Sequence, residues 1–247
     1  MRAKKKKALL FITILLMLAA VVGAMFQFTQ FGYLTTVPYR SAFTEIASHV
    51  YINRDYAGDR QELLEMIEQA KDRVRTFFGD LHFQDETTFI ICDDGKLTRK
   101  LGEDHGTVIV SFPVEAYYVC ISDEYLELDI LAHEITHAEL RSRLSVEAQK
   151  AIPTWFDEGL ALQNDYRESY SEAQWIAQTD NGKHTVALED MDTPAEFYAG
   201  EVEDRRFRYL NAKHELDVWM NAHGQQGLLE LIEKLNGGAD FASAYDS

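Results

Sequence analysis

The chain has 247 residues, of which 46% are hydrophobic and 12% aromatic. This composition suits one large domain or two lobes with a shared core, and it excludes disordered, collagen-like and disulfide-rich proteins. The 41 acidic residues outnumber the 24 basic ones and give a formal net charge of −17. Because such a chain repels phosphate groups, nucleic acid is excluded as a partner.

The first part of the chain differs from the rest in charge. Residues 1–7 contain five bases, and no acidic residue precedes Glu45. Residues 8–26 carry no charge, and as a helix they would extend roughly 28 Å, close to the thickness of a bilayer core. Since basic residues stay on the cytoplasmic side, the pattern predicts a cytoplasmic tail over 1–7 and a single-pass signal-anchor over 8–26 in the cell membrane, with the rest outside. The alternative is a cleaved signal peptide, because the small residues at 22–24 suit a cleavage site, and the protein would then be secreted.

Two cysteines, Cys92 and Cys120, leave the redox state open. An oxidising compartment would allow a disulfide, yet free cysteine is also common in hydrophobic cores. Their spacing matches no zinc-finger pattern, so we do not expect them to bind metal.

Strand-forming segments dominate the first half of the folded chain. Residues 27–44 are expected to form a juxtamembrane spacer, because proline disfavours helix in the residue before it. Over 45–122, β-branched and aromatic runs predict strands, and an apolar stripe predicts a helix from Asp59 to Gly79 packed on them. The predicted strands cover 50–52, 87–92, 107–112 and 116–122.

Helical periodicity dominates residues 123–247. The polar segment 181–203 interrupts it and is expected to form a surface loop. The sequence therefore predicts an α+β fold, with a small mixed or antiparallel sheet lobe over 45–122 and a mainly helical lobe over 123–247. The predicted helices cover 124–144, 153–164, 169–178, 206–223 and 226–235.

The first of two motifs with chemical meaning is His133-Glu134-Ile135-Thr136-His137. Residues four apart on a helix point in nearly the same direction, so the two histidines can bind one metal ion side by side. Glu134 points about 100° away from His133 and can reach a water molecule on that ion. The helix is apolar on two faces, so both imidazoles are expected to be buried and to need partners. Two core histidines bonded to backbone or carboxylate groups are the alternative interpretation.

The second motif is PTWFDEGLAL at 153–162. Proline suits the first turn of a helix, and Glu158 then lies in the middle of an apolar stripe. An unpaired carboxylate there is costly, so Glu158 is expected to bind metal or to pair with an arginine such as Arg141. The neighbouring Asp157 points about 100° away and is the weaker candidate ligand. Gly159 costs helix stability, which indicates close approach of another backbone.

With these residues the chain resembles the gluzincin zinc peptidases, whose catalytic core is the thermolysin-like zincin fold. Within that group it is most similar to the small membrane-attached bacterial proteins with a peptidase MA-like domain. The resemblance rests on HEITH and WFDEGLA and covers about residues 45–247 in element order. It implies one Zn²⁺ ion bound by His133, His137 and Glu158, with Glu134 as the general base.

The same resemblance carries further expectations about the site. Tyr209, on the helix after the long loop, corresponds to a tyrosine that donates a hydrogen bond to the developing oxyanion. Leu162 stands where thermolysin-like enzymes have an aspartate, so Asp129 becomes the candidate partner of His133. No G-x-M-E-N segment precedes HEITH in the part of the chain after residue 26, so the clamp that zinc aminopeptidases place on the substrate amino terminus is missing. This weakens an aminopeptidase interpretation and leaves an endopeptidase or no peptidase at all.

The expected function is that of a membrane-anchored, extracytoplasmic zinc metallopeptidase that hydrolyses peptide bonds in a peptide or protein substrate. A catalytically inactive zincin-fold binding or scaffold protein at the membrane is one alternative. A structural domain whose histidines never meet a metal is the other.

Overall fold

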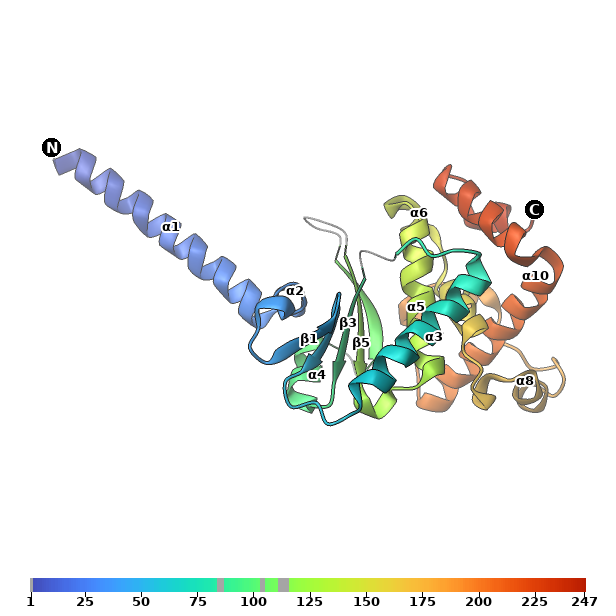
Figure 1. The fold of residues 1–247 in the computed structure, drawn as a ribbon. Helices are drawn as coiled ribbons and strands as arrows, with labels where there is room; N and C mark the ends of the chain where they lie inside the picture. The colour runs from blue at the N-terminus through green and yellow to red at the C-terminus, as the bar shows by residue number, and fades with distance from the viewer. Residues whose placement is uncertain (1, 84–86, 103–104, 111–115) are drawn as a thin grey trace. The chain divides into compact units, whose positions relative to one another are not determined.

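The computed structural model describes residues 2–83, 87–102, 105–110 and 116–247. Within these ranges the chain is mixed α+β, with a five-stranded sheet and mostly helices (Figure 1). It divides into two compact units. The sheet unit comprises Met1–Gly58 and Thr88–Glu124, and the helical unit comprises Asp59–Thr87 and Tyr125–Ser247.

The sheet has the strand order β1-β2-β3-β5-β4. Strands β1 and β2 are antiparallel, β2 and β3 are parallel, and β4 and β5 are antiparallel. His49, at φ 59°, adopts the left-handed conformation that reverses the chain between β1 and β2. The strand predicted at 107–112 corresponds to β4, and its last two residues lie outside the described ranges. The strands are β1 (Phe43–Ala47), β2 (Val50–Asn53), β3 (Thr87–Cys92), β4 (His105–Val110) and β5 (Ala116–Ser122).

The core of the sheet unit combines strand side chains with those of two short helices, α2 (Gln30–Thr35) and α4 (Gly95–Leu101). Leu34 on α2 is fully buried there. Part of the segment predicted to be a spacer therefore belongs to the folded unit. Cys92 and Cys120 are buried in the same core, and no disulfide joins them, which answers the question that the sequence leaves open.

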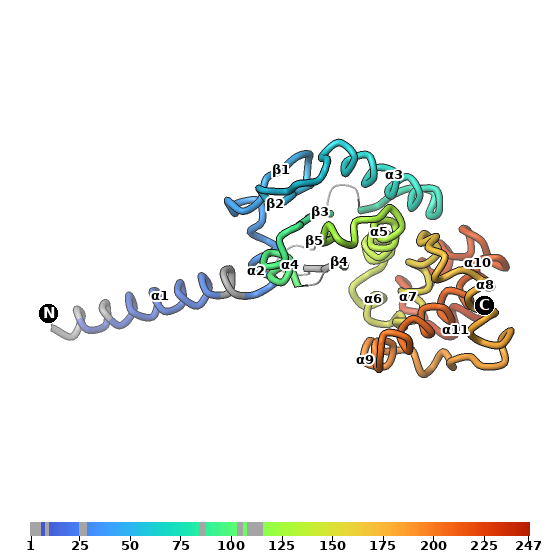
Figure 2. Tube along the Cα trace, turned by 90° about the horizontal axis from the view of Figure 1, so that it is seen from below, coloured from blue at the N-terminus to red at the C-terminus, as the bar shows by residue number. Residues whose placement is uncertain are grey.

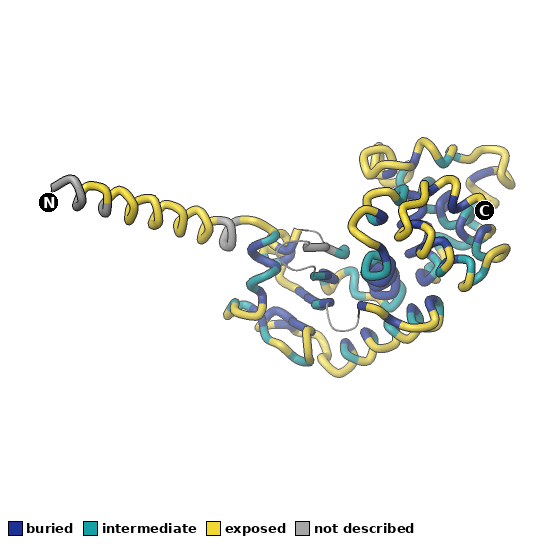
Figure 3. Tube along the Cα trace, turned by 90° about the horizontal axis from the view of Figure 1, so that it is seen from above, coloured by how far each residue is buried: buried dark blue, intermediate teal, exposed yellow. Residues whose placement is uncertain are grey.

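The N-terminal helix α1 (Arg2–Phe28) contains the segment predicted to cross a membrane, and the five bases of residues 1–7 lie in the same helix. Its described apolar side chains, over 10–24, are exposed (Figure 3). In the described part of the chain, no helix is both long and apolar enough to cross a membrane. The predicted transmembrane helix is therefore wrong, and so are the fold prediction that began with it and the single-pass location at the cell membrane.

Helix α3 (Arg60–Phe78) begins and ends at local signals. The Asp59 carboxylate accepts hydrogen bonds from two backbone N–H groups of the first turn, and Gly79, at φ 94°, ends the helix. Its buried stripe packs on α5 (Leu128–Arg143), which runs beside it in Figure 1. Helix α3 thus belongs to the helical unit, whereas the sequence suggested packing on the sheet.

The middle of the helical unit is α7 (Thr154–Ala161), which packs on both α5 and α10 (Val202–Asn236) (Figure 2). Helix α10 is interrupted at Gly224, at φ 64°, between the two helices predicted for this region. The other helices of this unit are α6 (Val146–Ala151), α8 (Glu172–Thr179), α9 (Pro194–Phe197) and α11 (Phe241–Tyr245).

The buried carboxylate of Glu139 on α5 binds the backbone of the segment that follows α3. The Glu139 side chain is fully buried and accepts hydrogen bonds from the backbone N–H groups of His82 at 2.9 Å and Phe83 at 3.3 Å. Arg143 pairs with the same carboxylate and with Asp80. Because these contacts satisfy the buried charge, they fix α5 relative to the end of α3.

Candidate metal centre

Helix α5 brings the two histidines of the motif together. His133 and His137 lie one turn apart with their rings 4.8 Å apart between centroids, and their Nε2 atoms are separated by 3.2 Å. Both side chains are about nine-tenths buried, because α5 is covered by neighbours on two faces. The predicted burial of these imidazoles is confirmed.

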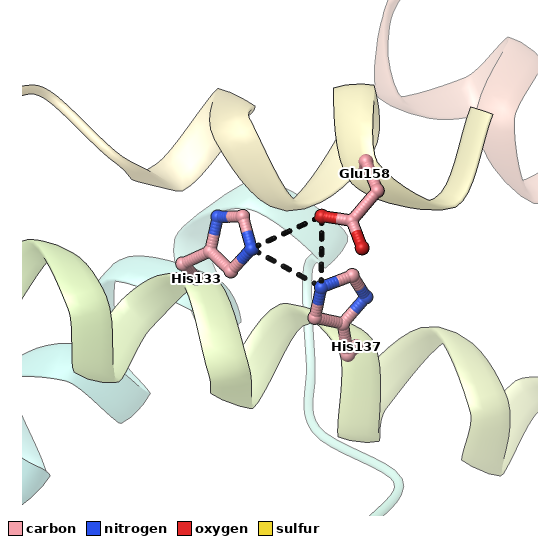
Figure 4. Close-up of side chains that lie close together, drawn as sticks. All are labelled: His133, His137 and Glu158. Carbon is pink, nitrogen blue, oxygen red and sulfur yellow. Dashed lines mark hydrogen bonds and ion pairs between the residues drawn. The ribbon is translucent and has the colours of Figure 1, made fainter. Parts of the chain in front are cut away.

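Glu158 approaches the same point from α7. Its Oε2 atom lies 3.4 Å from Nε2 of His133 and 3.6 Å from Nε2 of His137. Figure 4 shows the three side chains pointing toward one another from two helices. The next residue, Gly159, lets α7 pack closely on α10, because a Cβ atom there would lie 2.5 Å from the backbone oxygen of Ala212 on α10. The close backbone contact predicted for Gly159 is therefore confirmed.

The three ligand atoms fit one tetrahedral ion. Zinc bonds to nitrogen and oxygen of about 2.0–2.1 Å place two tetrahedral ligands about 3.3–3.4 Å apart, and the observed separations run from 3.2 to 3.6 Å. Oε2 of Glu158 is buried and has no hydrogen-bond partner, which is costly for a carboxylate oxygen unless a cation binds it. Two imidazole nitrogens with one carboxylate oxygen are a donor set that suits zinc. His133, His137 and Glu158 can therefore hold a metal ion.

Behind His137 lies an ion pair that the sequence did not predict. Nδ1 of His137 is 2.9 Å from Oδ1 of Asp157, and the guanidinium of Arg141 pairs with the other oxygen of Asp157. Burial alone would lower the pKa of His137, but the negative charges of Asp157 and Glu158 outweigh it and hold that pKa well above its usual range. The same negative potential favours a metal cation between the ligands.

His133 has a carboxylate behind it as well. Its Nδ1 atom lies 3.8 Å from Oδ2 of Asp165, which is fully buried. Arg167 donates from Nε to both oxygens of Asp165, at 2.9 and 3.0 Å. Asp129, the partner expected for His133, instead accepts a hydrogen bond from Arg73.

The other carboxylate oxygen of Glu158, Oε1, accepts a hydrogen bond. The hydroxyl of Tyr198 donates a hydrogen bond to Oε1. Burial would raise the pKa of Glu158, but the charge of His137 and the nearby imidazole of His133 hold it well below its usual range. Arg141, considered from the sequence as a partner of Glu158, pairs with Asp157 instead.

The two residues predicted to act on substrate lie in the same unit. Glu134 is buried on α5 next to His133. Tyr209 on α10 is half-buried, with its ring edge-on to Phe197 at 4.9 Å. Burial raises the pKa of Tyr209 far above its usual value, and the negative charges of Glu158 and Glu134 add to this effect, so its hydroxyl stays protonated.

Sequence reasoning missed Tyr198 and Asp165 and underrated Asp157. Asp157 had a signal, because a carboxylate beside an apolar stripe must find a partner, and α5 offers His137 and Arg141 one turn apart. Tyr198 had none, because it lies in a polar segment 40 positions beyond Glu158. Its approach depends on tertiary packing.

No protein-family model and no curated protein matches the chain. The function therefore has to be inferred from the residues of the site and their geometry.

Proposed function

We propose that the protein is a zinc-dependent hydrolase that cleaves peptide bonds, most simply as an endopeptidase. The observation that carries this proposal is the triangle of His133 Nε2, His137 Nε2 and Glu158 Oε2, with edges of 3.2 to 3.6 Å. Its support lies in the coincidence of this triangle with a buried Glu134 on the same helix. Holding a metal does not require Glu134, whereas activating water beside the metal does.

Each residue has a defined task in this proposal. When bound, zinc would polarise the scissile carbonyl and lower the pKa of a nearby water molecule. Glu134 takes a proton from that water at its carboxylate and passes it to the leaving amine. Tyr209 donates its hydroxyl proton in a hydrogen bond to the carbonyl oxygen as negative charge develops there. Asp157 binds Nδ1 of His137 and so turns its Nε2 toward the metal position, whereas Asp165 lies 3.8 Å from Nδ1 of His133, beyond hydrogen-bond distance.

Metal analysis of the full chain, purified without chelators, combined with cleavage of quenched fluorescent peptides, tests the proposal. We expect about one zinc per chain and cleavage that Glu134→Gln removes without loss of zinc, by a factor of at least about 10². Glu147→Gln, an exposed glutamate on α6, is the matched control and should cleave like the wild type.

The outcomes separate the three candidate functions. Zinc without cleavage in the wild type would overturn the peptidase and favour a metal-holding scaffold. Absence of zinc from the wild type, with no uptake on dialysis against zinc, would overturn both and favour a structural domain. Cleavage that survives in Glu134→Gln would refute the assigned base.

A further inference from the structure

The two oxygens of Glu158 have different surroundings. Oε2 faces the Nε2 atoms of both histidines and has no hydrogen-bond partner. Oε1 accepts the hydroxyl hydrogen of Tyr198. A carboxylate that is engaged in this way can offer one oxygen to a metal, while the other stays turned toward the phenol.

Tyr198 is held in place by the short helix that precedes it. Helix α9 begins with a capping box in which Thr193 and Glu196 bond each other's backbone N–H groups, and it packs on α7, the helix of Glu158. The ring of Tyr198 packs edge-on against Phe197, which is fully buried. The phenol therefore approaches Glu158 from an ordered element.

The phenol is the donor in this contact. A tyrosine hydroxyl carries one hydrogen, and a carboxylate oxygen can only accept it, so Tyr198 donates to Oε1.

The coordination mode of Glu158 decides how many ligands the protein supplies. With one oxygen from Glu158 and two imidazoles, the protein offers three ligands and leaves a single position of a tetrahedron open. A bidentate Glu158 would supply a fourth donor atom and favour ions that coordinate six to eight oxygen atoms. The restriction to one oxygen thus affects which metal binds and whether a position stays open.

We propose that Tyr198 is a positioning residue that keeps Glu158 monodentate and thereby makes the site selective for a four-coordinate metal. This inference rests on the proposed metal site and goes beyond it, because it assigns the choice of metal to a residue outside the ligand set.

Cobalt substitution of the full chain tests it, because four-coordinate Co²⁺ absorbs visible light much more strongly than five- or six-coordinate Co²⁺. We expect the wild type to show the intense spectrum and Tyr198→Phe to show a weaker one. The same variant should bind zinc about 10- to 100-fold more weakly in competition with a chromogenic chelator. Zinc X-ray absorption of both proteins should count one more oxygen ligand in the variant.

Tyr245→Phe is the matched control, since it also removes a phenol that donates to a glutamate, Glu215, at 3.1 Å within the helical unit. Its cobalt spectrum should equal that of the wild type. Tyr198 is 42% exposed, and phenylalanine keeps its ring contact with Phe197, so the variant should fold; circular dichroism checks this.

Three results would contradict the inference. If the wild type binds cobalt and Tyr198→Phe keeps its spectrum and zinc affinity, the positioning role fails while the metal site stands. If Tyr245→Phe changes the spectrum equally, the effect is structural and the assignment to Tyr198 fails. If the wild type takes up neither cobalt nor zinc, the positioning role and the proposed function fail together.

Discussion

Replacement of Gly159 by alanine tests whether the approach of α7 to α10 positions the site. The added Cβ atom would lie 2.5 Å from the backbone oxygen of Ala212 and 3.0 Å from a methyl carbon of Leu216. Ordinary contacts begin at 3.4 Å, so α7 and α10 would have to separate by up to about 0.9 Å. The oxygen belongs to a helix backbone and cannot turn away as a flexible side chain would.

Two opposing effects set the size of the change in stability. Alanine is a better helix former than glycine by about 1 kcal/mol, whereas overpacking a close contact costs about 1–3 kcal/mol. We therefore expect Gly159→Ala to lower the free energy of unfolding by up to about 2 kcal/mol, or Tm by roughly 2–8 °C. Because Glu158 precedes this glycine, a shift of nearly 1 Å in α7 should also reduce cleavage by about 10²-fold.

Urea unfolding measures the change in stability and peptide cleavage the change in activity, and zinc competition on the same samples shows whether the metal ligand has moved. Gly95→Ala is the control, because that helical glycine faces only the flexible end of Arg99 at 3.9 Å, and alanine there should be neutral or stabilising. If Gly159→Ala proves as stable as the control and binds zinc like the wild type, the close approach does not position Glu158.

Two further substitutions and one labelling experiment have expected outcomes. Glu139→Gln removes the charge from a buried carboxylate that binds two backbone N–H groups and Arg143, so the free energy of unfolding should fall by about 3 kcal/mol; a urea midpoint within error of the wild type would contradict this. Asp157→Asn weakens the contact that orients its histidine, so zinc affinity should drop about 10- to 100-fold in chelator competition, and unchanged affinity would exclude an orienting role. Burial raises the pKa of the Cys92 thiol and shields Cys120, so neither cysteine should react with a thiol reagent at pH 8 in the native protein. Both should react in denaturant without prior reduction. Fewer than two reactive thiols in denaturant would indicate that the two cysteines form a disulfide.

Features determined by local sequence were predictable. Helix α3 begins at Asp59 and ends at Gly79 because an acidic side chain can cap the first turn and glycine tolerates a positive φ. The pairing of His133 with His137 follows from helical periodicity alone. The position of Glu158 follows from the cost of leaving a carboxylate unpaired in an apolar stripe.

Features determined by tertiary packing were not predictable from the sequence. The sequence does not reveal that Tyr198 returns to Glu158, because the polar segment 181–203 carries no periodicity that would indicate its path. The membrane prediction failed for a different reason. It counted uncharged residues, and no helix in the described part of the chain is both long and apolar enough to cross a membrane.

Three consecutive residues of α7 solve one geometric problem. An imidazole ring has nitrogens on two edges, so a histidine that binds metal through Nε2 needs an acceptor on its Nδ1 side. Successive residues on a helix point about 100° apart, and Asp157 and Glu158 use this angle to reach the two edges of His137, at 2.9 Å from Nδ1 and 3.6 Å from Nε2. Gly159 then faces α10, where the absence of a side chain lets the two helices pack closely. The order aspartate, glutamate, glycine therefore has a physical reason, and exchanging Asp157 with Glu158 should abolish zinc binding even though the composition and charge of the helix stay the same.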